Sequence, residues 1–190
     1  MLEVSTRHSE LADRLRHHPM VAKVSESNFD LEFGGRTVSI GSGGEVTGVV
    51  ELMDNNPLVC ADHASTPNIE GTLATLALGP ILLSGLVTEP PVVLFSFEAD
   101  EASVNEALAS VEYHQPVTFG CDPHDLGSVR GIYCIAKIKP LTDFDELDAI
   151  YSERYEKSFF MRLATAAEWD TQLVSGKSFA AYRLEITEGE

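Results

Sequence analysis

Residues 116–138 read PVTFGCDPHDLGSVRGIYCIAKI and consist of two apolar segments on either side of a polar loop. The apolar segments, 117–120 and 132–138, have the length of short strands, and the loop contains the Pro, Gly and Asp residues that favour turns. A continuous apolar run at 92–97 and a helical pattern at 103–111 precede them. The order strand, helix, strand, strand predicts an α+β domain with an antiparallel or mixed sheet and helices on one face.

The residues that follow extend this pattern to the end of the chain. Thr142 and Asp145 have the spacing of a capping box, and 143–155 has apolar side chains at helical intervals. We expect closing strands at 159–163, 173–174 and 179–186. Residues 92–186 are therefore predicted to form a single sheet.

The N-terminal part has a different organisation. A helix is expected at 9–18, where Pro19 ends it, followed by a strand at 20–24. Residues 29–33 and 36–40 alternate apolar and polar side chains around Gly34-Gly35, the pair that a tight hairpin turn favours. These elements predict a small α/β-hairpin unit.

A loop is predicted at 54–67, because this segment contains Asp-Asn-Asn-Pro and Ser-Thr-Pro. We place the domain boundary there. Residues 1–56 form the small N-terminal subdomain and residues 57–190 form the larger α+β domain, which begins with an apolar helix at 73–86.

Composition restricts the classes of partner. The 190-residue chain has 30 acidic and 13 basic residues, a net charge of -17, which repels nucleic acids and anionic membranes. The longest apolar run, 73–87, contains Pro80 and is shorter than the roughly 20 residues of a membrane span. Three cysteines and an N-terminus without an apolar leader predict a cytoplasmic protein with thiols rather than disulfides.

Two blocks, 72–87 and 116–176, resemble the C-terminal catalytic and dimerisation domain of N-acetyl-gamma-glutamyl-phosphate reductases, relatives of the aspartate-semialdehyde dehydrogenases. The resemblance is carried by Pro123-His124, by Arg130-Gly131-Ile132 seven residues later, by the tyrosine-rich helix ending at 155, and by Phe160-Met161-Arg162-Leu163. It implies a homo-oligomer formed through the sheet. It also implies that His124, Arg130 and Gly131 bind a small anionic ligand, a carboxylate or acyl phosphate. The alternative is that Arg130 only fixes the loop by donating to backbone carbonyls.

The chain departs from these reductases at their catalytic residues. Ile69 occupies the position of the family's cysteine nucleophile, and 97–108 contains no histidine where the family has its catalytic one. Gly41 and Gly43 begin a dinucleotide fingerprint, but Val46 stands at its third glycine. We therefore expect no reductase activity and no binding of NAD or NADP, which calorimetry can test. The sequence favours a non-catalytic ligand-binding or oligomeric interaction module without a cofactor.

Two Cys-x-x-His segments support a second hypothesis. Cys60 with His63 and Cys121 with His124 supply the four sulfur and nitrogen ligands that zinc prefers. A site closed by all four would only stabilise the fold, whereas an open coordination position would indicate a metal-dependent enzyme. The simpler interpretation is that Cys60 and Cys121 are small buried thiols. A role as a subunit of a separately encoded nucleotide-binding partner also stays open.

Overall fold

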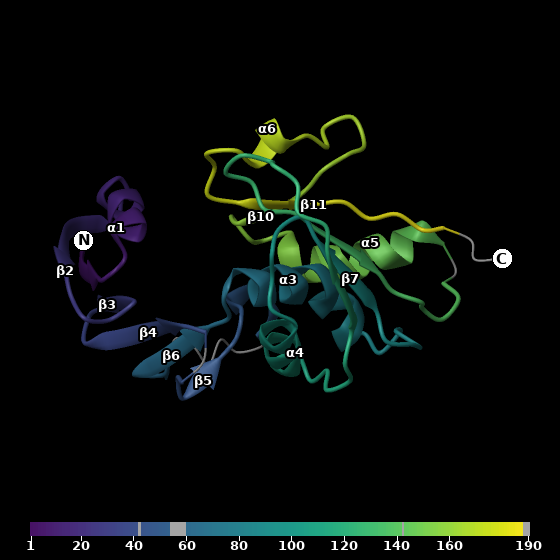
Figure 1. The fold of residues 1–190 in the computed structure, drawn as a ribbon, viewed down its shortest axis with the longest axis horizontal. Coiled ribbons are helices and arrows are strands. Elements are labelled where there is room, and N and C mark those ends of the chain that lie inside the picture. Colours follow the sequence, from purple (N-terminus) through teal and green to yellow (C-terminus); the bar gives the residue numbers. More distant parts are fainter. Residues whose placement is uncertain (42, 54–59, 142, 188–190) are drawn as a thin grey trace. The chain divides into compact units, whose positions relative to one another are not determined.

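The computed structural model describes residues 1–41, 43–53, 60–141 and 143–187 (Figure 1). The chain divides into two compact units, Met1–Ile69 and Glu70–Glu190. Both combine helices with strands, and their sheets contain parallel as well as antiparallel pairs, so the fold is α+β. Among the described residues, no helix has the length and apolar character needed to cross a membrane.

Unit 1 is built on a six-stranded sheet with the strand order β2-β1-β3-β4-β6-β5. Parallel strands β1 and β2 are joined by helix α1, whereas β3 pairs antiparallel with β1 and β4. The elements are β1 (Leu2–Thr6), α1 (Ser9–Arg16), β2 (Val21–Glu26), β3 (Leu31–Phe33), β4 (Arg36–Ile40), β5 (Val46–Thr47), η1 (Val50–Leu52) and β6 (His63–Thr66).

The hairpin predicted around Gly34-Gly35 is confirmed. Strands β3 and β4 pair through Phe33 and Arg36, and Gly34 and Gly35 have φ angles of 57° and 78°. Positive φ at both central residues is the geometry of the turn that joins twisted strands in two residues, and only glycine adopts it without strain.

Strand β6 was not predicted, because its residues were assigned to the loop at 54–67, of which 54–59 lie outside the described residues. His63–Thr66 pairs in parallel with β4 and β5. Its serine is 1% exposed, and the Ser65 hydroxyl hydrogen-bonds the Thr47 hydroxyl and accepts from the Gly44 N–H. These partners allow a polar residue in a buried strand. Because β6 belongs to the unit 1 sheet, the division between units follows Ile69 rather than residue 56.

Asp30 is a buried carboxylate in unit 1, with a side chain only 5% exposed. Its Oδ1 accepts from the side chains of Arg7 and His8 at 2.6 and 2.5 Å, and its Oδ2 accepts from the Ile40 N–H at 2.9 Å. Burial alone would raise the pKa of Asp30. The hydrogen bonds from Ile40, His8 and Arg7 outweigh burial and hold the pKa below its ordinary value.

This arrangement predicts a pH-dependent effect of Asp30→Asn. Charged Asp30 stabilises the fold above its unfolded pKa of about 3.9, and the contribution disappears as the pH falls through the lower folded pKa. The difference in unfolding free energy between the wild type and Asp30→Asn should therefore be largest at neutral pH and shrink below about pH 4. Chemical unfolding at stepped pH measures it. Asp13→Asn, which removes an exposed carboxylate paired with Arg16, is the control and should change stability little. A pH-independent loss in Asp30→Asn would contradict the prediction.

Unit 2 contains a three-stranded sheet in the order β8-β7-β9. Strands β7 and β8 are parallel and joined by α4, and β9 pairs antiparallel with β7. Side chains of Val93 and Phe95 on β7 and of Leu108 on α4 are fully buried. The elements are α3 (Ile69–Leu83), β7 (Val92–Phe95), α4 (Glu101–Ala109), β8 (Thr118–Cys121) and β9 (Ile132–Ile135).

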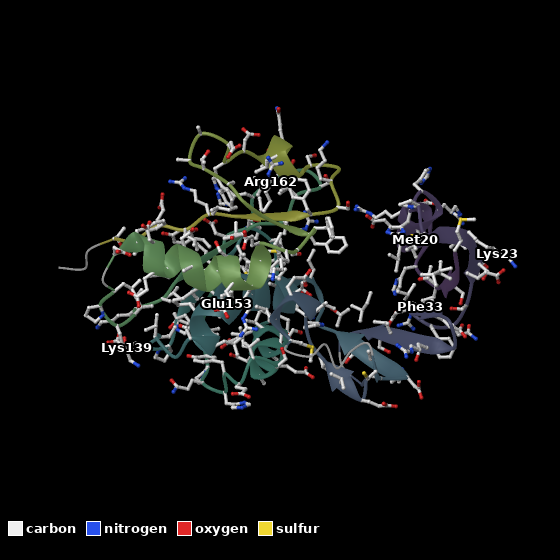
Figure 2. The ribbon with its side chains drawn as sticks, turned by 180° about the vertical axis from the view of Figure 1, so that it is seen from behind. Met20, Lys23, Phe33, Lys139, Glu153 and Arg162 are labelled. Carbon is white, nitrogen blue, oxygen red and sulfur yellow. The ribbon has the colours of Figure 1, made fainter. Side chains whose placement is uncertain are left out.

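The prediction of a single sheet across 92–186 is wrong. Beyond helix α5 (Phe144–Tyr155), strands β10 (Met161–Leu163) and β11 (Ala180–Tyr182) pair with each other as a separate parallel sheet. Arg162 extends from β10 and lies over the Phe179 ring at 5.9 Å (Figure 2). The strand expected at 173–174 is instead part of α6 (Thr171–Val174), because the Asp170 carboxylate accepts from the Gln172 N–H and caps a helical turn.

Helix α5 runs alongside α3 (Figure 1). Its predicted capping residue Thr142 lies outside the described residues, and Asp143 serves as N-cap by accepting from the Glu146 N–H. Tyr151 and Tyr155 are buried and donate their hydroxyls to the Ala77 and Leu76 carbonyls of α3, at 2.7 and 2.5 Å. The tyrosine-rich stretch of the sequence therefore fastens two helices together.

Candidate functional site

The residues predicted to bind an anion lie in the loop that follows β8. Ser96, directly after β7, anchors this loop through three hydrogen bonds. Its N–H donates to the Gly131 carbonyl at 3.0 Å, its carbonyl accepts from the His124 N–H at 2.9 Å, and its hydroxyl accepts from the Gly131 N–H at 2.9 Å. A Cβ at Gly131 would lie 3.2 Å from the Ser96 hydroxyl, so glycine permits this close approach. The fold thus brings His124, Arg130 and Gly131 to one loop.

The side chains of Arg130 and His124 contact mainly backbone carbonyls of the loop itself. The Arg130 guanidinium donates to the carbonyls of Gly127 and Val129 at 3.3 and 3.2 Å, and lies 5.6 Å from the centre of the Phe97 ring. The His124 Nδ1 lies 2.5 Å from the Asp122 carbonyl. Arg130 therefore holds the loop closed, a role that needs no ligand.

The N-terminus of helix α4, which follows β7, is already capped by a carboxylate. Asp100 caps α4, and the hydrogen bonds from Ser103 hold the pKa of this carboxyl below its ordinary value. A carboxylate at this position uses the favourable field of the helix N-terminus. Anion binding by His124, Arg130 and Gly131 stays a prediction.

The two Cys-x-x-His pairs belong to different units. In unit 1, Cys60 is exposed, which corrects its interpretation as a buried thiol, and the His63 Nδ1 hydrogen-bonds the Thr37 hydroxyl across the β4–β6 pair. In unit 2, half-buried Cys121 hydrogen-bonds the Ala99 carbonyl through its sulfur at 3.8 Å. Across the described ranges, no group of three or more His, Cys, Asp or Glu side chains is placed to hold a metal ion. Zinc binding stays a prediction for metal analysis of the purified protein.

Cys134 is the third thiol, and it was not a site candidate. Burial raises its pKa to about 12, so the reactive thiolate is scarce at neutral pH. Ile69, which the resemblance would align with a reductase nucleophile, is the first residue of α3 and 52% exposed. An exposed aliphatic side chain at a helix start has no nucleophilic chemistry.

One face of the β8-β7-β9 sheet has exposed apolar side chains, a feature that the predicted elements do not include. Val92 and Leu94 are each 38% exposed, and Tyr133 and Ile135 are 61% and 54% exposed. The strand register pairs Val92 with Ile135 and Leu94 with Tyr133, so these side chains adjoin on one face. We call it the outer face, and it consists of Val92, Leu94, Thr118, Gly120, Tyr133 and Ile135.

The signal for this face is present in the sequence. Val92-Val93-Leu94-Phe95 is apolar at every position, a pattern typical of a strand that is covered on both faces. Alternate residues Val93 and Phe95 are covered by the chain itself, at 0% exposure. Strand β7 therefore has two apolar faces, of which the described part of the chain covers only the one with Val93 and Phe95.

No protein-family model and no curated protein matches this chain. The resemblance to the reductase domain accordingly rests on the motifs alone.

Proposed function

We propose that this chain is a non-catalytic interaction module that self-associates through the outer face of its β8-β7-β9 sheet. The observation that carries the proposal is the set of four adjoining apolar side chains, each more than a third exposed, on one side of this sheet. Contiguous apolar surface of this kind marks interaction sites. The resemblance to a reductase domain that dimerises, combined with Ile69 in place of the nucleophile, supports binding rather than catalysis.

A second copy of the chain is the partner that charge favours. None of the six residues of the outer face is charged, whereas the whole chain carries -17. Two copies repel each other over most of their surface, and this repulsion is smallest where uncharged faces meet. A two-fold axis that lies between two facing copies, parallel to their sheets, brings the same patch onto itself, and aligned sheets pack about 10 Å apart.

The size of the face sets the strength of association. Three strands of four residues span about 14 by 13 Å, from the ordinary spacings of a sheet. A standard interface buries about 800 Å² on each partner. The outer face is much smaller than this, so it can form only the apolar centre of a dimer interface. Tyr133 provides an aromatic anchor there. We therefore expect a reversible dimer that dissociates at micromolar concentrations.

The test is sedimentation of the purified chain over a range of concentrations and ionic strengths. Salt shortens the Debye length from about 10 Å at about 0.1 M to about 3 Å at about 1 M. Screening weakens the mutual repulsion of two acidic copies, so added salt should tighten the dimer. An interface held by ion pairs would loosen instead. A chain that remains monomeric at every concentration and salt level would refute the proposal.

A further inference from the structure

A shallow pocket of about 480 Å³ lies in unit 1, where β1 ends and α1 begins. Its lining consists of three basic side chains, Arg7, His8 and Arg14, one acidic side chain, Glu10, and the side chains of Ser9, Leu11 and Ile40. Basic side chains outnumber acidic ones in this lining, the reverse of the whole chain, which has 30 acidic and 13 basic residues. The pocket is distinct from the outer face, which belongs to unit 2.

The buried carboxylate of Asp30 orients two of the basic side chains. Arg7 donates to its Oδ1 through Nε at 2.6 Å, with Nη2 also 2.6 Å from that oxygen, and His8 donates to the same oxygen through Nε2 at 2.5 Å. This contact uses one edge of the Arg7 guanidinium and leaves Nη1 for a ligand, in a side chain that is 56% exposed. A guanidinium fixed in this way loses little conformational freedom when it binds an anion.

Arg14 is held much more loosely. Arg14 lies one turn after Glu10 on α1, and its Nη2 is 3.2 Å from the Glu10 carboxylate. The arginine side chain is 63% exposed and the glutamate side chain 84% exposed. An exposed pair with a single contact contributes little to stability. Arg14 can therefore exchange Glu10 for an incoming anion at small cost.

We propose that this pocket binds a small organic anion. A carboxylate or phosphate head group contacts Arg7 and Arg14, and an apolar body packs on Leu11 and Ile40, the latter 48% exposed. Guanidinium groups bind both head groups through paired hydrogen bonds. The apolar wall distinguishes this ligand from inorganic ions.

The experiment uses the isotope-labelled full chain and three probes that share a phenyl ring: benzoate, phenyl phosphate and neutral benzyl alcohol. Chemical shifts of the Ser9, Glu10 and Leu11 amides report binding. We expect saturable shifts with benzoate, with phenyl phosphate or with both, and the probe that binds identifies the head group. Inorganic phosphate should bind more weakly because it lacks the apolar body.

Arg14→Gln and Arg16→Gln are the matched variants. Both arginines lie on α1 and form exposed pairs with acidic residues, but only Arg14 lines the pocket. Arg14→Gln should weaken probe binding about tenfold, the usual order for one charge-assisted contact. Arg16→Gln should leave it unchanged. Equal losses in the two variants, equal binding of benzyl alcohol, or shifts that do not saturate would overturn the proposal.

Discussion

Leu94→Asp should convert the self-associating chain into a monomer. Leu94 lies on the central strand β7, between Gly120 on β8 and Tyr133 on β9. In a two-fold dimer of sheets, each new carboxylate would be enclosed in an apolar contact without a partner, which is costly. We expect the dissociation constant to rise at least a hundredfold, about 3 kcal/mol. Sedimentation of the variant beside the wild type measures the change.

The control is Leu163→Asp, the same change at a leucine of similar exposure. Leu163 is 45% exposed on β10 and lies outside the outer face, whereas Leu94 is 38% exposed. The control should dimerise like the wild type. Tyr133→Asp, at a side chain that is 61% exposed, repeats the test where the monomer loses less packing. Dimers that persist in both outer-face variants, with unchanged circular dichroism, would exclude this face as the interface.

The comparison between sequence and structure shows which signals are local. The Gly34-Gly35 hairpin was predicted because two adjacent residues encode the turn. Strand β6 was missed because Ser65 and Thr66 resemble loop residues, and only their partners on β4 and β5 reveal a strand. Such partners are distant in the sequence and have no local signature.

The same limit applies to the sites. The loop that contains His124 and Arg130 was predicted because both flanking strands, β8 and β9, have a local apolar signature. The contacts of Asp30 with Arg7 and His8 join residues 23 and 22 positions apart, next to strands β1 and β3, whose pairing the sequence does not specify. The outer face could have been predicted in part, since the uninterrupted apolar run at 92–95 requires cover on both sides.

Tyr155→Phe should cause a large loss of stability at the contact between α5 and α3. In a regular helix the N–H of residue 80 donates to the carbonyl of Leu76, but Pro80 has no N–H. The Tyr155 hydroxyl takes its place at 2.5 Å, from a side chain that is 2% exposed. Tyr155→Phe removes this donor and keeps the ring, so the Leu76 carbonyl loses its partner. We expect the free energy of unfolding to fall by about 1–3 kcal/mol, measured by denaturant unfolding with Trp169 fluorescence.

Tyr151→Phe is the matched control, one turn earlier on α5. Its hydroxyl donates to the Ala77 carbonyl at 2.7 Å, and Ile81, which is not a proline, can donate to that carbonyl as in any helix. The loss in Tyr151→Phe should therefore be smaller. Pro80→Ala restores the missing N–H, so Tyr155→Phe should cost less in that background. The wild type, the two single variants and the double variant form a double-mutant cycle, in which the direct cost of Pro80→Ala cancels. The coupling free energy between positions 80 and 155 therefore isolates the contact with the Leu76 carbonyl. Equal losses in the two tyrosine variants, without coupling to position 80, would contradict the special role of the Leu76 carbonyl. Negligible losses in both would show that ring packing rather than the hydroxyls fastens α5 to α3.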